Sequence, residues 1–523
     1  MNHQYLKYLI LIAGLGFLAL MSAPRATATT TIANCAAAST LPCPSDGASP
    51  RAARSPQARQ ESSTGTVARD RGRKTGLGMG EHNLARHSAI DLGLTWNTFL
   101  GDDAGGEDHG FGIAVDASGN VYVAGWSEYA WGSPVRAFSV SIDAFAAKLD
   151  RNGNLIWNTF LGGSGLDSAR GIAVDGSGNV FVAGSSTAAW GSPMRNYTAR
   201  RDAFVAKLSS SGNLLWNTFL GGTQNENIDE DPGIAVDGSG IVYVVGYSQA
   251  AWGSPIRAYT MGRDPFVAKL DSSGNLMWNT FLGGTSYDEG LGIAVDESGN
   301  AYVAGYSGDT WGSPIRGYAG GWFDAFIAKL DSNGNLLWNT FLGGSSDDRG
   351  YTIALDGSRN AYVAGYSGAT WGSPVRTFTD RDALAAKVDS SGNLIWNTFL
   401  GGSGLDDGWG IAVDVIGNVL VAGQSDAGWG APVRPFALQT DAFAAKLDNN
   451  GNLTRNTFLG ANQRDEGNAI AIDADGNAYV AGTSELTWGS PVRKHLGWWH
   501  DAFAAKLATD LELQRLSLPL IIR

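Results

Sequence analysis

Seven tryptophans stand in copies of one short motif, Trp-Gly-Ser/Ala-Pro-x-Arg, spread along a chain of 523 residues. The aromatic face of a tryptophan can stack on a sugar ring, and neighbouring carboxylates can accept hydrogen bonds from its hydroxyl groups. The motif therefore predicts a ligand-binding surface for polysaccharide or protein. The competing interpretation is that each tryptophan packs its own loop, with the arginine paired to a nearby Asp. Constant loop length and the rigid proline favour this second interpretation. The tryptophans are Trp131, Trp190, Trp252, Trp311, Trp371, Trp429 and Trp488.

A few residues break the repetition, and an active site would need such asymmetry because one reaction uses one set of residues. His109 is one of them, and the stretch HLGWWHD at 495–501 adds two more candidate ligand-binding residues, Trp499 and His500. A His and a carboxylate brought together near these residues could act as general acid and base. The alternative function is therefore a secreted enzyme that acts on polysaccharide. The chain has no Ser/His/Asp signature and no phosphate-binding glycine loop, so no residue is assigned a catalytic role and a binding module is favoured. The other unrepeated residues are Trp322, Phe323, Trp409 and Arg455.

Acidic residues recur in two settings that resemble parts of calcium sites. One is the Asp-x-x-Gly-Asn turn, and the other is the set of acidic stretches between repeats. Calcium takes six to eight oxygen ligands, and the turns lack the distant bidentate Glu of an EF-hand. We therefore interpret the turns as loops capped by their own Asp, and the acidic stretches as the better candidates for calcium. Those stretches include Asp108, Asp167, Asp288, Asp348, Asp406 and Asp465.

These motifs sit on a repeat with a period of 58–62 residues. Four phrases, typified by W-N-T-F-L-G, G-I-A-V-D, A-Y-V-A-G and D-A-F-x-A-K-L, each occur seven times. All four are short, rich in β-branched and aromatic residues, and bounded by Gly, Asn, Asp and Ser, which is typical of strands. Four-stranded units that cannot bury both faces alone predict a seven-bladed β-propeller of antiparallel blades, with G-I-A-V-D innermost.

The first W-N-T-F-L-G, at residues 96–101, has no D-A-F phrase before it, and the last D-A-F phrase, at 501–507, has no W-N-T-F-L-G after it. Each is the part that the other lacks. We therefore expect the N-terminal strand to complete the last blade as its outermost strand. This pairing would close the ring and remove an exposed sheet edge.

The phrase GNLLWNTFLGGSSDDRGYTIALDGSRNAYVAGYSG at 334–368, followed by DALAAKVDSSGN, resembles the bacterial β-propeller repeat abbreviated SBBP. The resemblance covers roughly residues 93–507 and implies the propeller fold. It also implies a secreted or surface protein, and it transfers no catalytic residue. The W-G-S-P-x-R insertion departs from the general pattern of the repeat.

Charge is distributed unevenly along the chain. Residues 1–92 carry ten basic and five acidic residues, whereas the remainder carries 27 basic and 45 acidic residues. Nucleic acids and anionic membranes are bound by positive surfaces. An acidic folded region therefore argues against both as partners, and we expect a monomer that binds polysaccharide or protein.

The N-terminus has the pattern of a secretory signal peptide. Lys7 precedes an apolar run at 8–21, and A-T-A at 26–28 offers a cleavage site, so residues 1–28 are expected to direct export to the cell surface or medium. The run is too short for a comfortable membrane span, and no stable span is expected in the mature chain. Residues 29–90 are expected to form a disordered linker, residues 91–510 the propeller and residues 511–523 a tail.

Overall fold

The computed structural model describes residues 93–102, 105–198, 200–223, 226–227, 233–497 and 499–508. The chain divides into two compact units, Met1–His82 and Asn83–Arg523, and all described residues belong to the second. The expected signal peptide, the whole of the expected linker and the expected tail lie outside the described residues. Among the residues that are described, no helix is long and apolar enough to cross a membrane.

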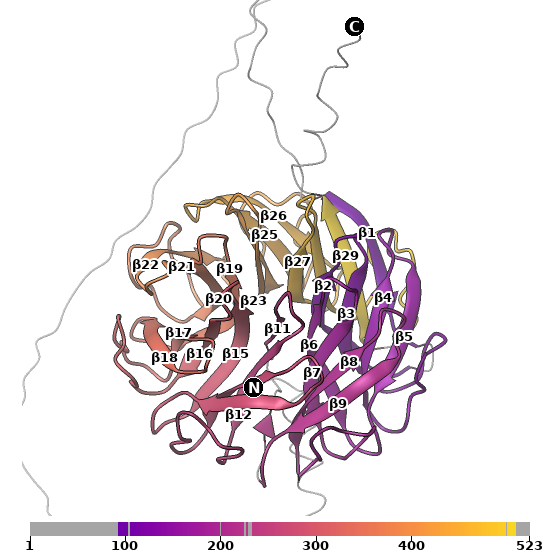
Figure 1. Cartoon of the computed structure of the whole chain (residues 1–523). Coiled ribbons are helices and arrows are strands. Elements are labelled where there is room, and N and C mark those ends of the chain that lie inside the picture. Colours follow the sequence, from indigo (N-terminus) through magenta and orange to yellow (C-terminus); the bar gives the residue numbers. More distant parts are fainter. Residues whose placement is uncertain are drawn as a thin grey trace, which may run out of the picture. The chain divides into compact units, whose positions relative to one another are not determined.

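The second unit is a seven-bladed β-propeller, as predicted, with the blades arranged in a ring (Figure 1). The strands are given below from the innermost to the outermost of each blade. Blade 1 contains β2 (Asp108–Val115), β3 (Val121–Ser127), β4 (Asp143–Leu149) and β5 (Leu155–Leu161). Blade 2 contains β6 (Asp167–Val174), β7 (Val180–Ser186), β8 (Asp202–Leu208) and β9 (Leu214–Leu220). Blade 3 contains β10 (Glu226–Asn227), β11 (Ile234–Val236), β12 (Val242–Ser248), β13 (Asp264–Leu270) and β14 (Leu276–Phe281).

The remaining four blades follow the same order. Blade 4 contains β15 (Asp288–Val295), β16 (Ala301–Ser307), β17 (Asp324–Leu330) and β18 (Leu336–Leu342). Blade 5 contains β19 (Asp348–Leu355), β20 (Ala361–Ser367), β21 (Asp382–Val388) and β22 (Leu394–Leu400). Blade 6 contains β23 (Asp406–Val413), β24 (Val419–Ser425), β25 (Asp441–Leu447) and β26 (Leu453–Leu459). Blade 7 contains β27 (Asp465–Ile472), β28 (Ala478–Ser484), β29 (Asp501–Ala508) and β1 (Gly93–Leu100).

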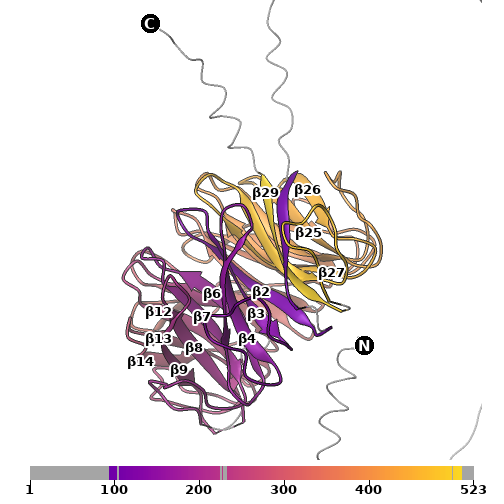
Figure 2. The same cartoon turned by 90° about the vertical axis from the view of Figure 1, so that its right-hand side faces the viewer.

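The ring is closed by the N-terminal strand, as the displaced phrase predicted. β1 pairs antiparallel with β29, from Gly93 opposite Ala508 to Leu100 opposite Ala502. Figure 2 shows the indigo strand alongside the yellow strands of blade 7. The side chain of Leu100 is fully buried in a core shared with blade 1. The two ends of the propeller therefore hold each other in place.

The Asp-x-x-Gly-Asn segments form the capped turns that their composition indicates. In the turn after β2, Oδ1 of Asp116 accepts hydrogen bonds of 2.9 Å from the amides of Ser118 and Asn120, and Gly119 has a φ of +78°. Oδ2 of Asp116 accepts a further bond of 2.8 Å from the Asn120 side chain. These bonds use the carboxylate oxygens to fix the hairpin connection.

Each regular inner strand contains a β-bulge, which was not predicted. In β2 the register against β3 shifts between Gly110 and Gly112, so that Phe111 is the extra residue. Gly125 of β3 lies opposite this irregularity, and a Cβ there would lie only 1.7 Å from the His109 carbonyl oxygen. The glycine of the A-Y-V-A-G phrase is therefore required by close backbone approach. The bulged residues in the six inner strands are Phe111, Arg170, Leu291, Tyr351, Trp409 and Asn468.

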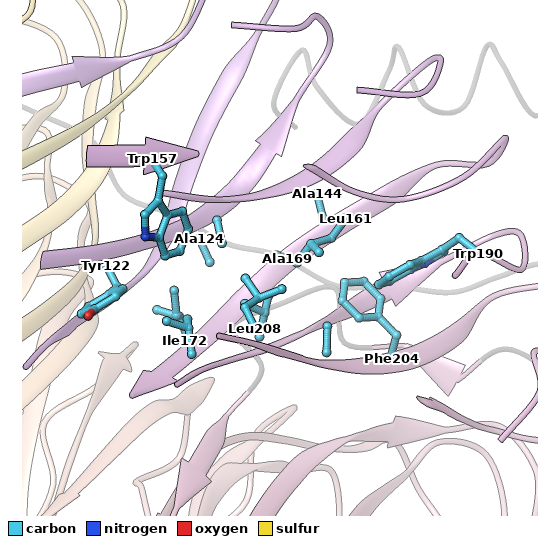
Figure 3. Close-up of a cluster of buried hydrophobic side chains, with 14 of the residues drawn as sticks. Tyr122, Ala124, Ala144, Trp157, Leu161, Ala169, Ile172, Trp190, Phe204 and Leu208 are labelled. Atoms are coloured by element: carbon cyan, nitrogen blue, oxygen red, sulfur yellow. The ribbon is translucent and has the colours of Figure 1, made fainter. Parts of the chain in front are cut away.

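The hydrophobic cores lie between neighbouring blades, not within them. In the core shown in Figure 3, Tyr122 and Trp157 of blade 1 share one cluster with Ile172, Phe204 and Leu208 of blade 2. The same positions form the cores at the other junctions. Burial of each large apolar side chain contributes about 1.5–3 kcal/mol, so every blade is stabilised mainly by its two neighbours.

Candidate functional site

Two sets of loops share one face of the ring, which we call the loop face. One set joins consecutive blades, and the other joins the second and third strands of each blade. Backbone hydrogen bonds link the two sets: the Asp167 amide donates to the Ile142 carbonyl at 2.9 Å, and the Asp348 amide donates to the Phe323 carbonyl at 2.8 Å. Loops from neighbouring blades therefore form a continuous, mutually supported surface.

The seven motif tryptophans are buried within this framework. Trp131 is 4% exposed, and its ring packs edge-to-face on Phe145 with the centroids 5.2 Å apart. The Arg493 guanidinium of the preceding blade lies 5.7 Å from the Trp131 ring centroid. The other six tryptophans are 4–6% exposed and are covered in the same way by the motif arginine of the blade before. Their aromatic faces are therefore not available for stacking on a ligand in this structure.

The Asn of W-N-T-F-L-G fastens each long loop to the outer strand, and the motif arginine does so as well in every blade except blade 6, where Nη1 of Arg434 has no hydrogen-bond partner. Arg136 donates to the carbonyls of Phe160 and Gly162 at 2.8 and 2.7 Å, and the Asn158 side chain donates to the Trp131 carbonyl at 2.7 Å. The expected partner of the arginine, a neighbouring Asp, is replaced by these carbonyls. The loop also bonds to the outer strand through its backbone, from the Val135 amide to the Asn158 carbonyl. The motif thereby covers the free edge of the outer strand.

Six carboxylates expected on the loop face are instead buried at the first position of the inner strands. The prediction that these residues lie in the loops between blades is wrong, because the inner strands begin several residues before G-I-A-V-D. Each of these Asp side chains approaches the first Asp of the preceding blade's third strand. At the junction of blades 4 and 5, Asp348 and Asp324 lie on either side of Gly343, where a Cβ would be 2.7 Å from one carboxylate and 2.9 Å from the other. Burial raises the pKa of Asp324 to about 7 and that of Asp348 to about 6. The six are Asp108, Asp167, Asp288, Asp348, Asp406 and Asp465.

The positions that differ between blades collect around the axis of the loop face. The bulged residues line an axial cavity of about 190 Å³ together with neighbouring inner-strand residues. Three further variable positions surround its mouth: the second residue of the inner strand, the last but one of the second strand, and the residue before the third strand. We call all of these the mouth residues. In the order of these three positions, the residues are Glu289, Tyr306 and Phe323 in blade 4; Arg349, Tyr366 and Arg381 in blade 5; Asp407, Gln424 and Thr440 in blade 6; Glu466, Thr483 and His500 in blade 7; and His109, Trp126 and Ile142 in blade 1.

Blades 4–6 place an aromatic cluster at the mouth. The Tyr351 ring stacks on the Trp409 ring with centroids 4.3 Å apart and an angle of 8° between the planes. Leu291, Tyr306 and Tyr366 join them in one buried cluster. These side chains come from five inner and second strands of three different blades, so the cluster exists only because the ring aligns those strands.

Two arginines are set among these rings. The Arg349 guanidinium lies 4.5 Å from the Tyr306 ring centroid, and the Arg381 guanidinium lies 3.8 Å from that of Tyr366. Arg381 also makes a 2.6 Å ion pair with Asp407 of blade 6. About a third of the Arg381 side chain is exposed, whereas Asp407 is buried. Each arginine is thus held by its neighbours while remaining partly open to solvent on the loop face.

Large apolar side chains are exposed on the loops beside the mouth. Trp322, which precedes the third strand of blade 4, is 81% exposed. Trp499, a predicted ligand-binding residue at the corresponding place in blade 7, is 53% exposed, and Tyr287 before blade 4 is 57% exposed. Exposed aromatic residues of this size are common at protein interaction sites.

The two predicted histidines come together where the ring closes. The His109 and His500 rings have centroids 5.1 Å apart. Glu107, His109 and His500 each place one ligand atom within 4.8 Å of the others, which makes them the group of the described residues able to hold a metal ion. His495, from the same stretch, lies instead near Asp501, with 3.9 Å between Nδ1 and Oδ2. Proximity of blades 1 and 7 therefore produces the His–carboxylate arrangement that the two unrepeated stretches suggested.

Sequence reasoning missed the tyrosines and arginines of the mouth. Trp409 and Phe323 stand out as unrepeated, but Tyr306, Tyr351 and Arg381 do not, because similar residues occur at many places in the repeat. A signal was nevertheless present: these positions change between blades while the residues on either side repeat. Such a contrast marks positions that the scaffold does not constrain.

Five segments of the chain match the SBBP β-propeller repeat, at residues 95–128, 156–189, 278–312, 337–370 and 457–485. The regulatory protein FlaEY of Caulobacter vibrioides is 30% identical over 208 residues, which are 37% of this chain and 22% of that protein. An uncharacterized WD repeat-containing protein of Acanthamoeba polyphaga mimivirus is 22% identical over 529 aligned residues, covering 77% of this chain and 37% of that protein. The chain thus spans less than two fifths of the length of either relative.

Solved structures with similar architecture include two WD40 propellers. The WD40 domain of Pan2 from Neurospora crassa has a TM-score of 0.41 at 10% identity, covering 77% of this chain and 90% of that domain. The WD40 domain of Doa1 has a TM-score of 0.43 at 11% identity, covering 80% of this chain and 97% of that domain. At these scores neither structure bears on the binding site or on the partner.

Proposed function

We propose that this chain, which carries SBBP β-propeller repeats, is an interaction module that binds a protein partner across the mouth of its axial cavity. The observation that carries the proposal is the location of the unrepeated residues. Tyr, Trp, Phe and Arg gather at the mouth in blades 4–6, whereas the repeated residues are used in the framework. Tyr, Trp and Arg are enriched in protein interfaces and at their energetic hot spots.

The packing of the mouth supports the same proposal. Rings that are already stacked, as Tyr351 and Trp409 are, lose little conformational freedom when a partner covers them. Arg381 is likewise held by Tyr366 and Asp407 before any partner arrives. The exposed Trp322 beside this cluster supplies apolar area at the rim.

We further propose that the protein acts as a monomer outside the cytoplasm, at the cell surface or in the medium. The apolar run at 8–21 and the small residues at 26–28 support export. Polysaccharide remains a competing ligand class. It now depends on Trp322 and Trp499, because the motif tryptophans are buried.

The test compares two double variants of the full chain. Trp322→Ala with Arg381→Ala alters the mouth, and Val415→Ala with Ile416→Ala alters a turn on the opposite face, where these residues are 92% and 69% exposed. Each protein is used to capture partners from extracts and culture medium of its source cells, and captured proteins are quantified by mass spectrometry. The proposal expects a partner that the wild type and the Val415/Ile416 control retain and that the mouth variant loses, with the Kd of the purified pair raised at least tenfold.

The outcome that contradicts the proposal is equal capture by all three proteins, or loss only in the control. A parallel screen against glycans distinguishes the ligand class. Glycan binding that the mouth variant loses, without a protein partner, would replace the proposed function by the polysaccharide alternative.

A further inference from the structure

Two of the six histidines of the chain meet at the junction of blades 7 and 1. His109 is the second residue of β2, and His500 directly precedes β29. A backbone hydrogen bond of 2.7 Å from the Asp108 amide to the His500 carbonyl holds the two segments together. Glu107 directly precedes β2 at the same place. No other blade has a histidine at either position.

The three side chains are close to the spacing that one metal ion requires. Nε2 of His109 lies 3.6 Å from Oε2 of Glu107, and the ligand atoms of all three residues lie within 4.8 Å of one another. Two ligand atoms at about 2.0–2.1 Å from a tetrahedral zinc ion are about 3.3 Å apart. Small rotations of the His500 and Glu107 side chains are therefore enough to reach that geometry, since both are partly exposed.

His109 is held in one orientation by its surroundings. Its ring stacks on Trp126 with centroids 4.3 Å apart and lies parallel to Phe111 at 5.8 Å. Nδ1 of His109 lies 3.3 Å from the Thr483 hydroxyl, whereas the buried Nε2 has no hydrogen-bond partner. A histidine that donates Nδ1–H to a fixed acceptor presents Nε2 with a free electron pair, which is the arrangement found in metal-bound histidines.

The second histidine fits the same role. The buried Nδ1 of His500 also has no hydrogen-bond partner, while its Nε2 lies 3.1 Å from Oε1 of Glu485. A carboxylate that accepts from one ring nitrogen of a histidine orients the ring and leaves the other nitrogen for a metal.

We propose that Glu107, His109 and His500 bind one transition-metal dication, for which Zn²⁺ is the best match, at the junction of blades 1 and 7. Two imidazoles and one carboxylate form the ligand set that zinc uses when its fourth position stays open. Calcium fits poorly because it takes six to eight oxygen ligands. This site goes beyond the proposed interaction function and does not depend on it.

The location gives the metal a structural consequence. Glu107 and His109 belong to blade 1 and His500 belongs to blade 7, so a shared ion would cross-link the first and last blades next to the β1 strand. A ligand that binds only the folded state stabilises it in proportion to the logarithm of its concentration over Kd. Bound zinc is therefore expected to strengthen ring closure.

The test uses the full chain with Cys35→Ser and Cys43→Ser, which removes both cysteines and hence any thiolate ligand. After chelator treatment, Co²⁺ and Zn²⁺ are titrated with calorimetric detection, and the visible Co²⁺ spectrum reports the coordination number. We expect one ion per chain with the absorption of a four-coordinate site. His500→Ala and Glu107→Gln are expected to abolish this binding, and His495→Gln, outside the cluster, to retain it.

Two further measurements separate a metal site from a polar cluster. Thr483→Val keeps the shape of a buried side chain and removes the partner of His109 Nδ1, so the affinity is expected to fall about 10–100-fold. Zn²⁺ is expected to raise the Tm of the wild type and not that of His500→Ala, which also shows that the variant folds. The proposal is overturned if the wild type binds no Co²⁺, or if His500→Ala and Glu107→Gln bind it as the wild type does. Partner capture is measured independently, so failure of either proposal leaves the other intact.

Discussion

Replacing Asp324 by Asn is expected to stabilise the protein at alkaline pH and to change its stability little at acid pH. Asp324 is fully buried at the junction of blades 4 and 5, and burial raises its pKa to about 7, with Asp348 adding to the effect and Arg316 opposing it. Its Oδ2 accepts a 2.6 Å hydrogen bond from the Ala319 amide, which an Asn side-chain oxygen can also accept. Asn therefore keeps the shape and this bond but never carries a charge.

The magnitude follows from the difference in pKa between the folded and unfolded chain. Below the unfolded value of 3.8 the carboxyl is protonated in both states, and its contribution to stability is fully present. As the pH rises from there to about 7, the unfolded chain releases the proton and the folded protein retains it, so the free energy of unfolding falls. One such group accounts for about 1.4 kcal/mol per pH unit, or about 4 kcal/mol in all. Because Asp348 shares the titration, we expect about 2–4 kcal/mol.

The assay is urea unfolding of the wild type and of Asp324→Asn at about pH 4 and about pH 8, followed by tryptophan fluorescence. The matched control is Asp331→Asn, in the turn after the same strand. The Asp331 carboxylate accepts 2.9 Å bonds from the amides of Asn333 and Asn335, and the bonds from Asn335 and Asn333 lower its pKa. A carboxyl whose pKa is lowered by folding stabilises the folded protein at pH values above its pKa in the unfolded chain, and this contribution is lost as the pH falls through its pKa in the folded protein. Asp331→Asn removes the contribution, so this variant should be less stable than the wild type mainly at alkaline pH. Equal destabilisation by Asp324→Asn at both pH values would refute the reasoning.

Three other tests, two of them paired comparisons, probe the framework. Arg376→Lys keeps the charge but loses the paired hydrogen bonds of 2.8 and 2.6 Å to the carbonyls of Phe399 and Gly401, and the contact with Trp429 of the next blade. Its free energy of unfolding, measured by chemical denaturation, should fall by about 1–3 kcal/mol. Leu100 in the closing strand and Leu161 in the outer strand of blade 1 are both fully buried. Replacing either by Ala should lower the free energy of unfolding by about 2–5 kcal/mol. A much smaller loss for Leu100→Ala would show that the closing strand is loosely held. Gly365→Ala would place a Cβ 1.8 Å from a paired backbone oxygen and should cost more than about 1–3 kcal/mol, whereas Gly357→Ala, with no atom within 4 Å, should leave the Tm nearly unchanged.

The strand order and the closing strand could be predicted because both depend on short sequence phrases that recur in every repeat. Seven copies of four phrases specify four strands, and the displaced phrase at 96–101 has only one partner available. Where the inner strands begin could not be predicted in the same way. The residues 108–111 do not alternate between apolar and polar, because a bulge and a buried carboxyl interrupt the pattern.

The candidate site was predictable only in part. His109 and His500 could be brought together in advance, because ring closure makes blades 1 and 7 neighbours. The role of the motif tryptophans required the contacts themselves: Trp131 is covered by Arg493 of another blade, and no local pattern identifies that arginine as its partner. The mouth cluster of Tyr351 and Trp409 likewise depends on how two blades are aligned.

The sequence by itself determined the number of blades, their strand order and the closure of the ring. It could do so because every junction uses the same residue types, and a repeated contact leaves a repeated pattern. Only the tertiary structure decided which residues face solvent. The repeated tryptophans and Asp side chains are buried because they join neighbouring blades, and the unrepeated residues meet at the axis because the ring brings the same position of every blade to one place.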